Sequence, residues 1–147
     1  MNKLEGYRQI LGTHGQMWWD NELVYEVESI EAKTTAVREK VTMAGSMDED
    51  SKITGFKSEG NFKIKKVYSR GVKKIVDAWK EGKDIRSKLV VKLADPDSFG
   101  TERVVIDNIW FNEVVLAQFE MGKRLDRTYK FGFKLENVDF PDLIDVK

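Results

Sequence analysis

The stretch Ile53–Ser69, ITGFKSEGNFKIKKVYS, decides the fold class because its apolar and polar residues alternate. The apolar members fall on one side of an extended chain and are Phe56, Phe62, Ile64 and Tyr68. The other side carries a polar row that consists of Lys57, Glu59, Asn61, Lys63 and Lys65. Successive side chains of a strand point to opposite faces of a sheet. The stretch therefore predicts a strand with one buried face and one wet face.

The next segment, SRGVKKIVDAWKEG (Ser69–Gly82), predicts the one convincing helix of the chain. Its apolar side chains recur at helical spacing and form a stripe of Val72, Ile75, Val76 and Trp79. Ser69 is placed to cap the start of the helix, and Gly82 is placed to end it in a left-handed conformation.

Upstream, two apolar segments flank Asp20-Asn21, a pair that tolerates the positive φ of a tight turn. The segments Gln16–Trp19 and Leu23–Val27 are therefore expected to form a hairpin. We expect Leu23, Tyr25 and Val27 to point to one face and Glu26 and Glu28 to the other. A change of phase near Ser29-Ile30 predicts a bulge.

Trp18 and Trp19 must face opposite sides of this first strand. One is expected to anchor the core. The other is expected to meet a second sheet, the N-terminal arm (residues 1–15) or a neighbouring subunit. This geometry argues against a shared aromatic cage.

Residues 22–43 and 53–68 are each extended for longer than the usual strand of roughly 5–6 residues. Joined through an inter-strand loop (residues 43–52), they would form one long hairpin. Part of it is polar on both sides and would project as a ribbon that needs neighbouring strands. The alternative is that each stretch is two shorter strands separated by bends, and pattern alone favours this alternative.

Three further strands are expected downstream. The first, over residues 85–93, points Ile85, Ser87, Leu89, Val91 and Leu93 inward and ends at the turn DPDSFG. The second, over residues 101–122, is apolar on both faces, with Val104, Ile106 and Trp110 opposite Val105, Ile109 and Phe111, so we expect both of its faces to be covered. The last is expected to point Tyr129, Phe131, Phe133 and Leu135 inward.

Composition sets limits on function. At 147 residues the chain is expected to be one domain with its own core. It has no cysteine, which excludes disulfides, thiol nucleophiles and cysteine-based zinc sites. No apolar stretch is long enough to serve as a secretion signal or a membrane span, so we expect synthesis in the cytoplasm and no membrane anchor. Its 25 basic and 25 acidic residues cancel, which is unlike a dedicated nucleic-acid binder.

The charges nevertheless cluster along the chain. Residues 20–31 carry five acids and no base, residues 51–74 carry eight bases and one acid, and residues 135–146 carry four acids and no base. These clusters could be complementary faces between identical subunits. Equally, they could pair with each other inside one monomer.

The sequence predicts no catalytic, cofactor or metal site. His14 is the only histidine and lies in a loop without an orienting partner, so we interpret it as a solvated residue. Asp95 and Asp97 share the spacing of a calcium loop, but the rest of that pattern is missing. The lysines of the polar row could follow a phosphate backbone, yet the same face lacks aromatics for base stacking.

Three stretches together resemble the tail tube proteins of contractile phage tails, most closely the PBSX-type tube proteins of prophages. They are ILGTHGQMWWDNELVYEVESIEAKTTAVREKV (Ile10–Val41), ITGFKSEGNFKIKKVYSRGVKKIVDAWKEG (Ile53–Gly82) and DNIWFNEVVLAQFEMGKRLDRTYKFGFKLENVDFPDLI (Asp107–Ile144). They cover nearly the whole chain in order. One departure is Asn21, where the resemblance leads us to expect glycine.

The resemblance implies a mainly β subunit, a β-barrel or split barrel with a long projecting hairpin and one flanking helix. Six subunits would close into a ring, and rings would stack into a hollow tube inside a contractile sheath, without a catalytic role. The polar row (Lys57, Glu59, Asn61, Lys63 and Lys65), with part of residues 31–39, would face the bore. The N-terminal arm and the inter-strand loop, including Met43, Ser46, Asp48, Glu49, Asp50 and Lys52, would contact stacked rings.

The implied partners are copies of the chain itself, tail sheath, baseplate and tape-measure proteins, and DNA in transit without sequence-specific binding. The implied location is the virion tail after assembly in the host cytoplasm. The main alternative is a monomeric, lipocalin-like ligand-binding β-barrel, which the length and an early tryptophan would suit. An enzyme ranks third among the interpretations, because the sequence shows no arrangement of a nucleophile and a base.

Overall fold

A computed structural model describes residues 3–146 and shows a mainly antiparallel β structure with one α-helix in that range. The strands are β1 (Gly15–Trp19), β2 (Glu22–Leu23), β3 (Val27–Val41), β4 (Asp50–Lys65), β5 (Ser87–Leu93), β6 (Glu102–Glu113), β7 (Asp126–Gly132) and β8 (Val138–Asp142). The helix α1 spans Val72–Lys80, and 3₁₀ turns cover Gly6–Arg8, Gly12–His14 and Leu135–Asn137. The predicted fold class is confirmed.

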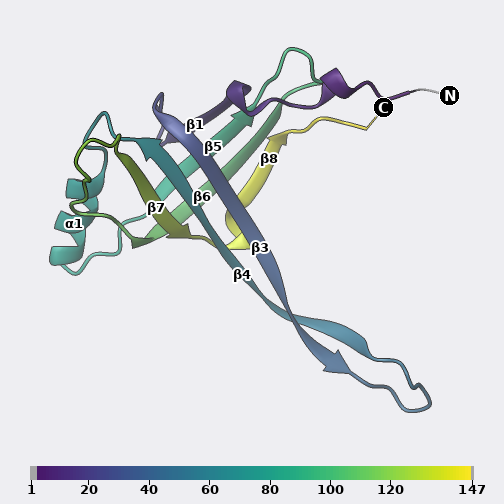
Figure 1. The fold of residues 1–147 in the computed structure, drawn as a ribbon. Coiled ribbons are helices and arrows are strands. Elements are labelled where there is room, and N and C mark those ends of the chain that lie inside the picture. The colour runs from purple at the N-terminus through teal and green to yellow at the C-terminus, as the bar shows by residue number, and fades with distance from the viewer. Residues whose placement is uncertain (1–2, 147) are drawn as a thin grey trace.

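The strands form one path in the order β2-β1-β5-β6-β7-β4-β3, and β8 pairs with β6 beside it. Both ends of the path, β2 and β3, are open edges, so the barrel is split rather than closed (Figure 1). All pairings between these strands are antiparallel.

Strand β6 joins the two halves of the path because it bends at Asn108. Its first part pairs with β5 up to Ile109, and its last part pairs with β7 from Trp110. Asn108 has φ +55°, and two residues of β6, Asp107 and Asn108, oppose the single residue Lys88 of β5, which is a bulge. The bulge shifts the phase, so Ile106 and Phe111 are both buried in one core. The expected division of β6 into two alternating apolar faces is therefore wrong.

Aromatic rings fill the space between the two halves. The Trp19 ring lies 5.3–5.4 Å from the rings of Phe62, Phe111 and Tyr129, and Phe62 stacks on Tyr129 at 4.9 Å. Trp19 is buried, whereas Trp18 lies on the other face opposite Val90 and is half-buried. The prediction that the two tryptophans face opposite sides is confirmed.

The long hairpin exists as one continuous element. Strands β3 and β4 contain 15 and 16 residues and pair from Val27–Ile64 to Val41–Asp50. Pattern alone favoured two shorter strands with bends, and that preference is wrong. The pairing of β3 with β4 has two register shifts, at Val27/Ser29 and at Val37/Arg38. The first lies close to the predicted bulge.

The segment before β3 departs from the expected alternation. Residues 24–26 are not part of a strand, since Tyr25 and Glu26 form a turn and the Val24 amide donates to the Met17 carbonyl at 2.9 Å. Val24 and Glu26 are therefore buried, while Tyr25 points outward and is 84% exposed. The predicted Asp20-Asn21 turn is confirmed, since both residues have positive φ.

The helix begins later than predicted. Gly71, with φ +64°, precedes its first turn, and no side chain caps it, so the Ser69 cap is wrong. The left-handed stop at Gly82 is confirmed, with φ +75° and an amide that donates to the Trp79 carbonyl. Ile75 is the buried centre of the predicted stripe, and Val72 packs against the core beside it.

Three residues that the alternation placed inward are exposed, because their strands have left the core or ended. Phe56 lies on the projecting part of β4, Tyr68 follows the end of β4, and Leu135 follows the end of β7. In contrast, the residues of β4 and β7 that were placed inward, and Phe133 directly after β7, are buried as predicted; these strand residues are Phe62, Ile64, Tyr129 and Phe131.

Candidate functional site

The most distinctive feature of the molecule is the hairpin β3–β4, which extends far beyond the rest of the sheet (Figure 1). Only Glu59–Lys65 of β4 pairs with β7. In the described part of the chain, the distal residues Asp50–Lys57 pair with β3 alone, and the outer edge of β3 has no partner strand. An isolated two-stranded ribbon is marginally stable in water, and an unpaired edge is a template for another strand.

The polar row lies on one face of β4, opposite the side that Phe62 and Ile64 bury. Its cross-strand neighbours on β3 include Glu31 beside Asn61 and Lys33 beside Glu59. Lys63 lies 4.0 Å from a carboxylate oxygen of Glu28 and 3.5 Å from one of Asp126 on β7. The face is therefore a mixed-charge surface in which acids and bases alternate across three strands.

The inter-strand loop residues all lie at the exposed end of the hairpin. This end contains Met43, Ser46, Asp48, Glu49, Asp50 and Lys52, of which the last two already belong to β4. Gly45 has φ +87° and turns the chain, and the Asp48 amide donates to Ser46 Oγ at 3.2 Å. Lys40 Nζ lies 3.2 Å from Glu49 Oε1. Asp48 and Asp50 give the tip an acidic character.

The N-terminal segment is held against the loop that follows β5. The Leu11 amide donates to Asp95 Oδ2 at 2.9 Å, and Arg8 Nη1 donates to the Asp97 carbonyl at 3.2 Å. His14 Nε2 lies 3.9 Å from Asp95 Oδ1. Asp95 also accepts the Asp97 amide, so its carboxylate joins the N-terminal segment to the loop after β5. The described residues contain no cluster of three or more potential metal ligands. These amides, first that of Leu11, hold the pKa of Asp95 below its ordinary value.

Asp95→Asn is expected to loosen the N-terminal segment, because the amide side chain has one acceptor oxygen for two backbone donors. Limited proteolysis within residues 3–14 should become faster. Asp97→Asn is the matched control, because Asp97 contributes only its backbone groups to these hydrogen bonds. In the unchanged protein the attachment should hold above the ordinary aspartate pKa of about 3.9 and fail as the pH falls through the lowered pKa. Equal proteolysis of both variants would contradict this role.

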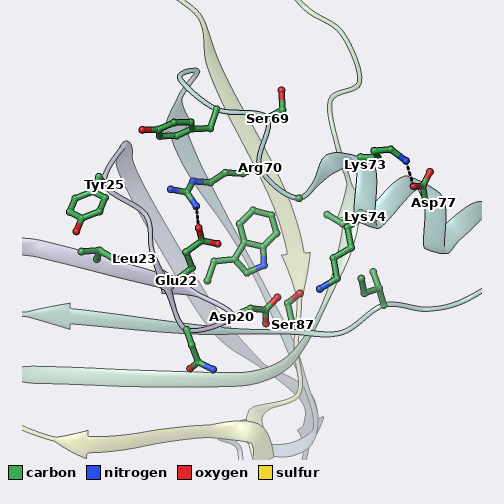
Figure 2. Close-up of a pocket in the computed structure, with 16 residues that line it drawn as sticks. Asp20, Glu22, Leu23, Tyr25, Ser69, Arg70, Lys73, Lys74, Asp77 and Ser87 are labelled. Carbon is green, nitrogen blue, oxygen red and sulfur yellow. Dashed lines mark hydrogen bonds and ion pairs between the residues drawn. The ribbon is translucent and has the colours of Figure 1, made fainter.

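An open groove beside α1 holds the charged residues that sequence reasoning did not connect. Arg70 reaches Glu22 across it, with Tyr25 and Leu23 at the rim (Figure 2). Arg70 also makes two hydrogen bonds to the buried carboxylate of Glu26, which raise the pKa of Arg70, and the Arg70 carbonyl accepts the Tyr129 hydroxyl at 2.8 Å. These groups satisfy one another and form a structural clamp. Sequence reasoning offered no sign of this contact beyond the acid Glu26, which was expected on the face opposite Leu23 and Tyr25.

The clamp shows how the acidic and basic clusters of the sequence pair with each other. Glu22, Glu26 and Glu28 of the acidic cluster pair with Arg70 and Lys63 of the basic cluster. At these positions the clusters meet inside one monomer. Glu28 and Lys63 lie on the paired strands β3 and β4, whereas Arg70 follows β4 and reaches Glu22 of β2 and Glu26 before β3.

Comparison with known proteins identifies the family. A model of the phage tail tube protein family matches residues 2–142. The Phage-like element PBSX protein XkdM of Bacillus subtilis (strain 168) is 28% identical over 141 residues, which are 95% of this chain and 95% of that protein.

Solved structures share the fold at low sequence identity. A chain of the anti-feeding prophage cap, a tube-terminating cap, has a TM-score of 0.70 at 6% identity and covers 97% of each chain. A chain of the sheath-tube complex of the extracellular contractile injection system PVC, in its extended state, has a TM-score of 0.67 at 6% identity and covers 92% of this chain and 93% of that one. The family match extends over almost the entire sequence, and the chain therefore belongs to the phage tail tube protein family, with a structural role in the tail tube.

Proposed function

We propose that six copies of this chain close into a ring and that the rings stack into a hollow tube, which serves a contractile tail as a conduit through the host envelope. The observation that supports this most strongly is the hairpin β3–β4. Within the described residues, its distal strands pair only with each other, and the outer edge of β3 has no partner. A second copy can supply the missing strands. Contacts between unlike surfaces of identical subunits generate rings and filaments.

The polar row would face the bore. Lys57, Glu59, Asn61, Lys63 and Lys65 lie on the side of β4 that points away from the aromatic core, and Glu31, Lys33 and Thr35 of β3 continue this face. A water-filled channel requires a polar lining. Because acids and bases are mixed on this face, passing DNA would not be held by the phosphate contacts that give basic surfaces their affinity.

The inter-strand loop (residues 43–52) and the N-terminal arm (residues 1–15) would contact neighbouring rings. For the arm, this role concerns residues 3–15, since residues 1–2 lie outside the described part of the chain. In the loop we assign the contacts to Met43, Ser46, Asp48, Glu49, Asp50 and Lys52. The exposed apolar side chains of Met43 and its neighbour Met47 support this assignment, because clusters of exposed apolar side chains mark contact surfaces.

Deletion of Met43–Lys52 is expected to abolish stacking and leave the monomer folded. None of the buried core residues lies in this segment, so the aromatic core stays intact. Negative-stain electron microscopy and circular dichroism of the purified variant test the two halves of the prediction. Tubes of normal length would refute the role of the loop.

The remaining parts of the proposal concern partners and location. The tube would bind sheath, baseplate and tape-measure proteins, assemble in the host cytoplasm and act as a single domain without catalysis. The described residues contain no helix long and apolar enough to cross a bilayer. A screen for hydrolase activity is expected to find none.

Electron microscopy of the purified chain at high concentration tests the proposal as a whole. Rings or tubes are expected, and six-fold class averages would support the stated symmetry. A strictly monomeric protein would overturn it. The lipocalin-like alternative is wrong, because the chain belongs to the tail tube family and the sheet formed within residues 3–146 is open at β2 and β3.

A further inference from the structure

The β6–β7 loop (residues 114–125) is a second exposed apolar surface. It contains 12 residues without helix or strand, which is long for a connection between adjacent antiparallel strands. Leu116, Phe119 and Met121 are 71%, 74% and 85% exposed. Long irregular loops in compact domains usually carry function, and exposed apolar clusters mark contact surfaces.

The chain itself holds this loop in place, so it is a defined surface rather than a loose end. The Leu125 carbonyl accepts the Lys66 amide at 2.9 Å, and the Gln118 carbonyl accepts Arg127 Nη2 at 2.8 Å. Near Gly122, whose φ is +79°, the Lys123 amide donates to the Glu120 carbonyl at 3.1 Å. These bonds place the loop at the end of the sheet where β4 leaves it.

That position is the far end of the molecule from the hairpin tip, as Figure 1 shows. The loop adjoins the last residue of β4, whereas the tip precedes its first. The two ends are also opposite in charge. Asp48 and Asp50 lie at the tip beside Lys52, whereas Arg124 lies at the loop end, where Lys123 is paired with Glu120 at 3.3 Å and Lys66 Nζ donates to the Tyr68 carbonyl at 3.0 Å. Both ends carry exposed apolar side chains, which are Met43 and Met47 at the tip.

We propose that the β6–β7 loop of one copy is the receiving surface for the hairpin tip of the next copy in the stack. This inference rests on the proposed stacking and names the second half of that contact. Two unlike, complementary surfaces at opposite ends of one subunit make a head-to-tail contact, which repeats without limit along an axis. Apolar burial around Phe119 and Met47 supplies the attraction, and the charges fix the orientation.

Crosslinking tests this contact directly, because the chain has no cysteine of its own. Met47→Cys and Phe119→Cys are made in separate preparations, mixed, allowed to assemble and treated with a short bis-maleimide. A covalent dimer that contains both variants is expected. The matched control mixes Met47→Cys with Tyr7→Cys, an exposed residue of the N-terminal arm. Preferential linkage to Tyr7→Cys would assign the tip to the arm and overturn the proposal.

Charge reversal provides an independent test. Arg124→Glu and Asp48→Arg are each expected to shorten or abolish tubes, and the double variant is expected to restore them. Both side chains are exposed, so circular dichroism should show an unchanged fold. Normal tubes from Arg124→Glu, or no restoration in the double variant, would overturn the contact while the tube proposal stands. Failure of the unchanged chain to assemble would instead overturn the proposed function.

Discussion

Glu26→Ala is expected to lower the free energy of unfolding by about 3–5 kcal/mol, which is the usual effect of removing one partner from a buried ion pair. The side chains of Glu26 and Arg70 are only 4% and 14% exposed. Without Glu26, the Arg70 guanidinium keeps its contact with the Tyr68 ring and its ion pair with Glu22, whose side chain is largely exposed to solvent. The clamp that joins residues 22–26 to Arg70, just before α1, is then lost. Urea unfolding followed by tryptophan fluorescence measures the loss.

Glu28→Ala is the matched control for this prediction. Glu28 lies two residues further along the chain, and its ion pair with Lys63 is 41% exposed on both sides. Such pairs contribute roughly 0–1 kcal/mol. The double variant Glu26→Leu/Arg70→Met should recover most of the stability, because it removes both charges together. A loss in Glu26→Ala no larger than in Glu28→Ala would show that the clamp is not a major source of stability.

Gly71→Ala is expected to destabilise the fold by about 2–5 kcal/mol, through backbone strain and overpacking combined. Gly71 has φ +64°, a conformation that costs a residue with a side chain about 1–2 kcal/mol. A Cβ at this position would lie 2.4 Å from Cη2 and 2.8 Å from Cζ2 of Trp19. The indole cannot move aside, because it contacts Phe62, Phe111 and Tyr129.

Gly82→Ala separates the two contributions. Gly82 has φ +75° at the other end of α1, and no atom lies within 4 Å of the position of its Cβ. This variant should therefore show the backbone cost of about 1–2 kcal/mol and nothing more. Thermal and urea unfolding of both variants give the comparison. Equal losses would mean that Trp19 adjusts to the added methyl group.

Several features followed from the sequence because they depend on local periodicity. Alternation placed Phe62 and Ile64 on one face of β4 and the polar row on the other, and the ladder has that phase. Helical spacing identified the stripe of α1 around Ile75. The residue types at Asp20-Asn21 and Gly82 identified backbone conformations with positive φ.

The functional surfaces were predicted less completely. The resemblance to tail tube proteins led to the hairpin and its loop, whereas the residue pattern alone favoured shorter strands. Most of the β6–β7 loop was wrongly predicted to be part of a covered strand over residues 101–122, because exposed apolar residues look the same in a sequence as buried ones, whereas β6 ends at Glu113. The Glu26–Arg70 clamp joins residues 44 positions apart, and no local pattern relates them.

The sequence by itself determined which side chains share a face, since this depends only on the repeat of a strand or helix. Only the tertiary structure decided where along each element that face is covered. Phe56 and Phe62 lie in the same alternation of β4, yet Phe62 is fully buried and Phe56 is 57% exposed. The difference arises because β7 and the aromatic core end before the hairpin does. Burial depends on the extent of the opposing layer, which is set by residues distant in the sequence.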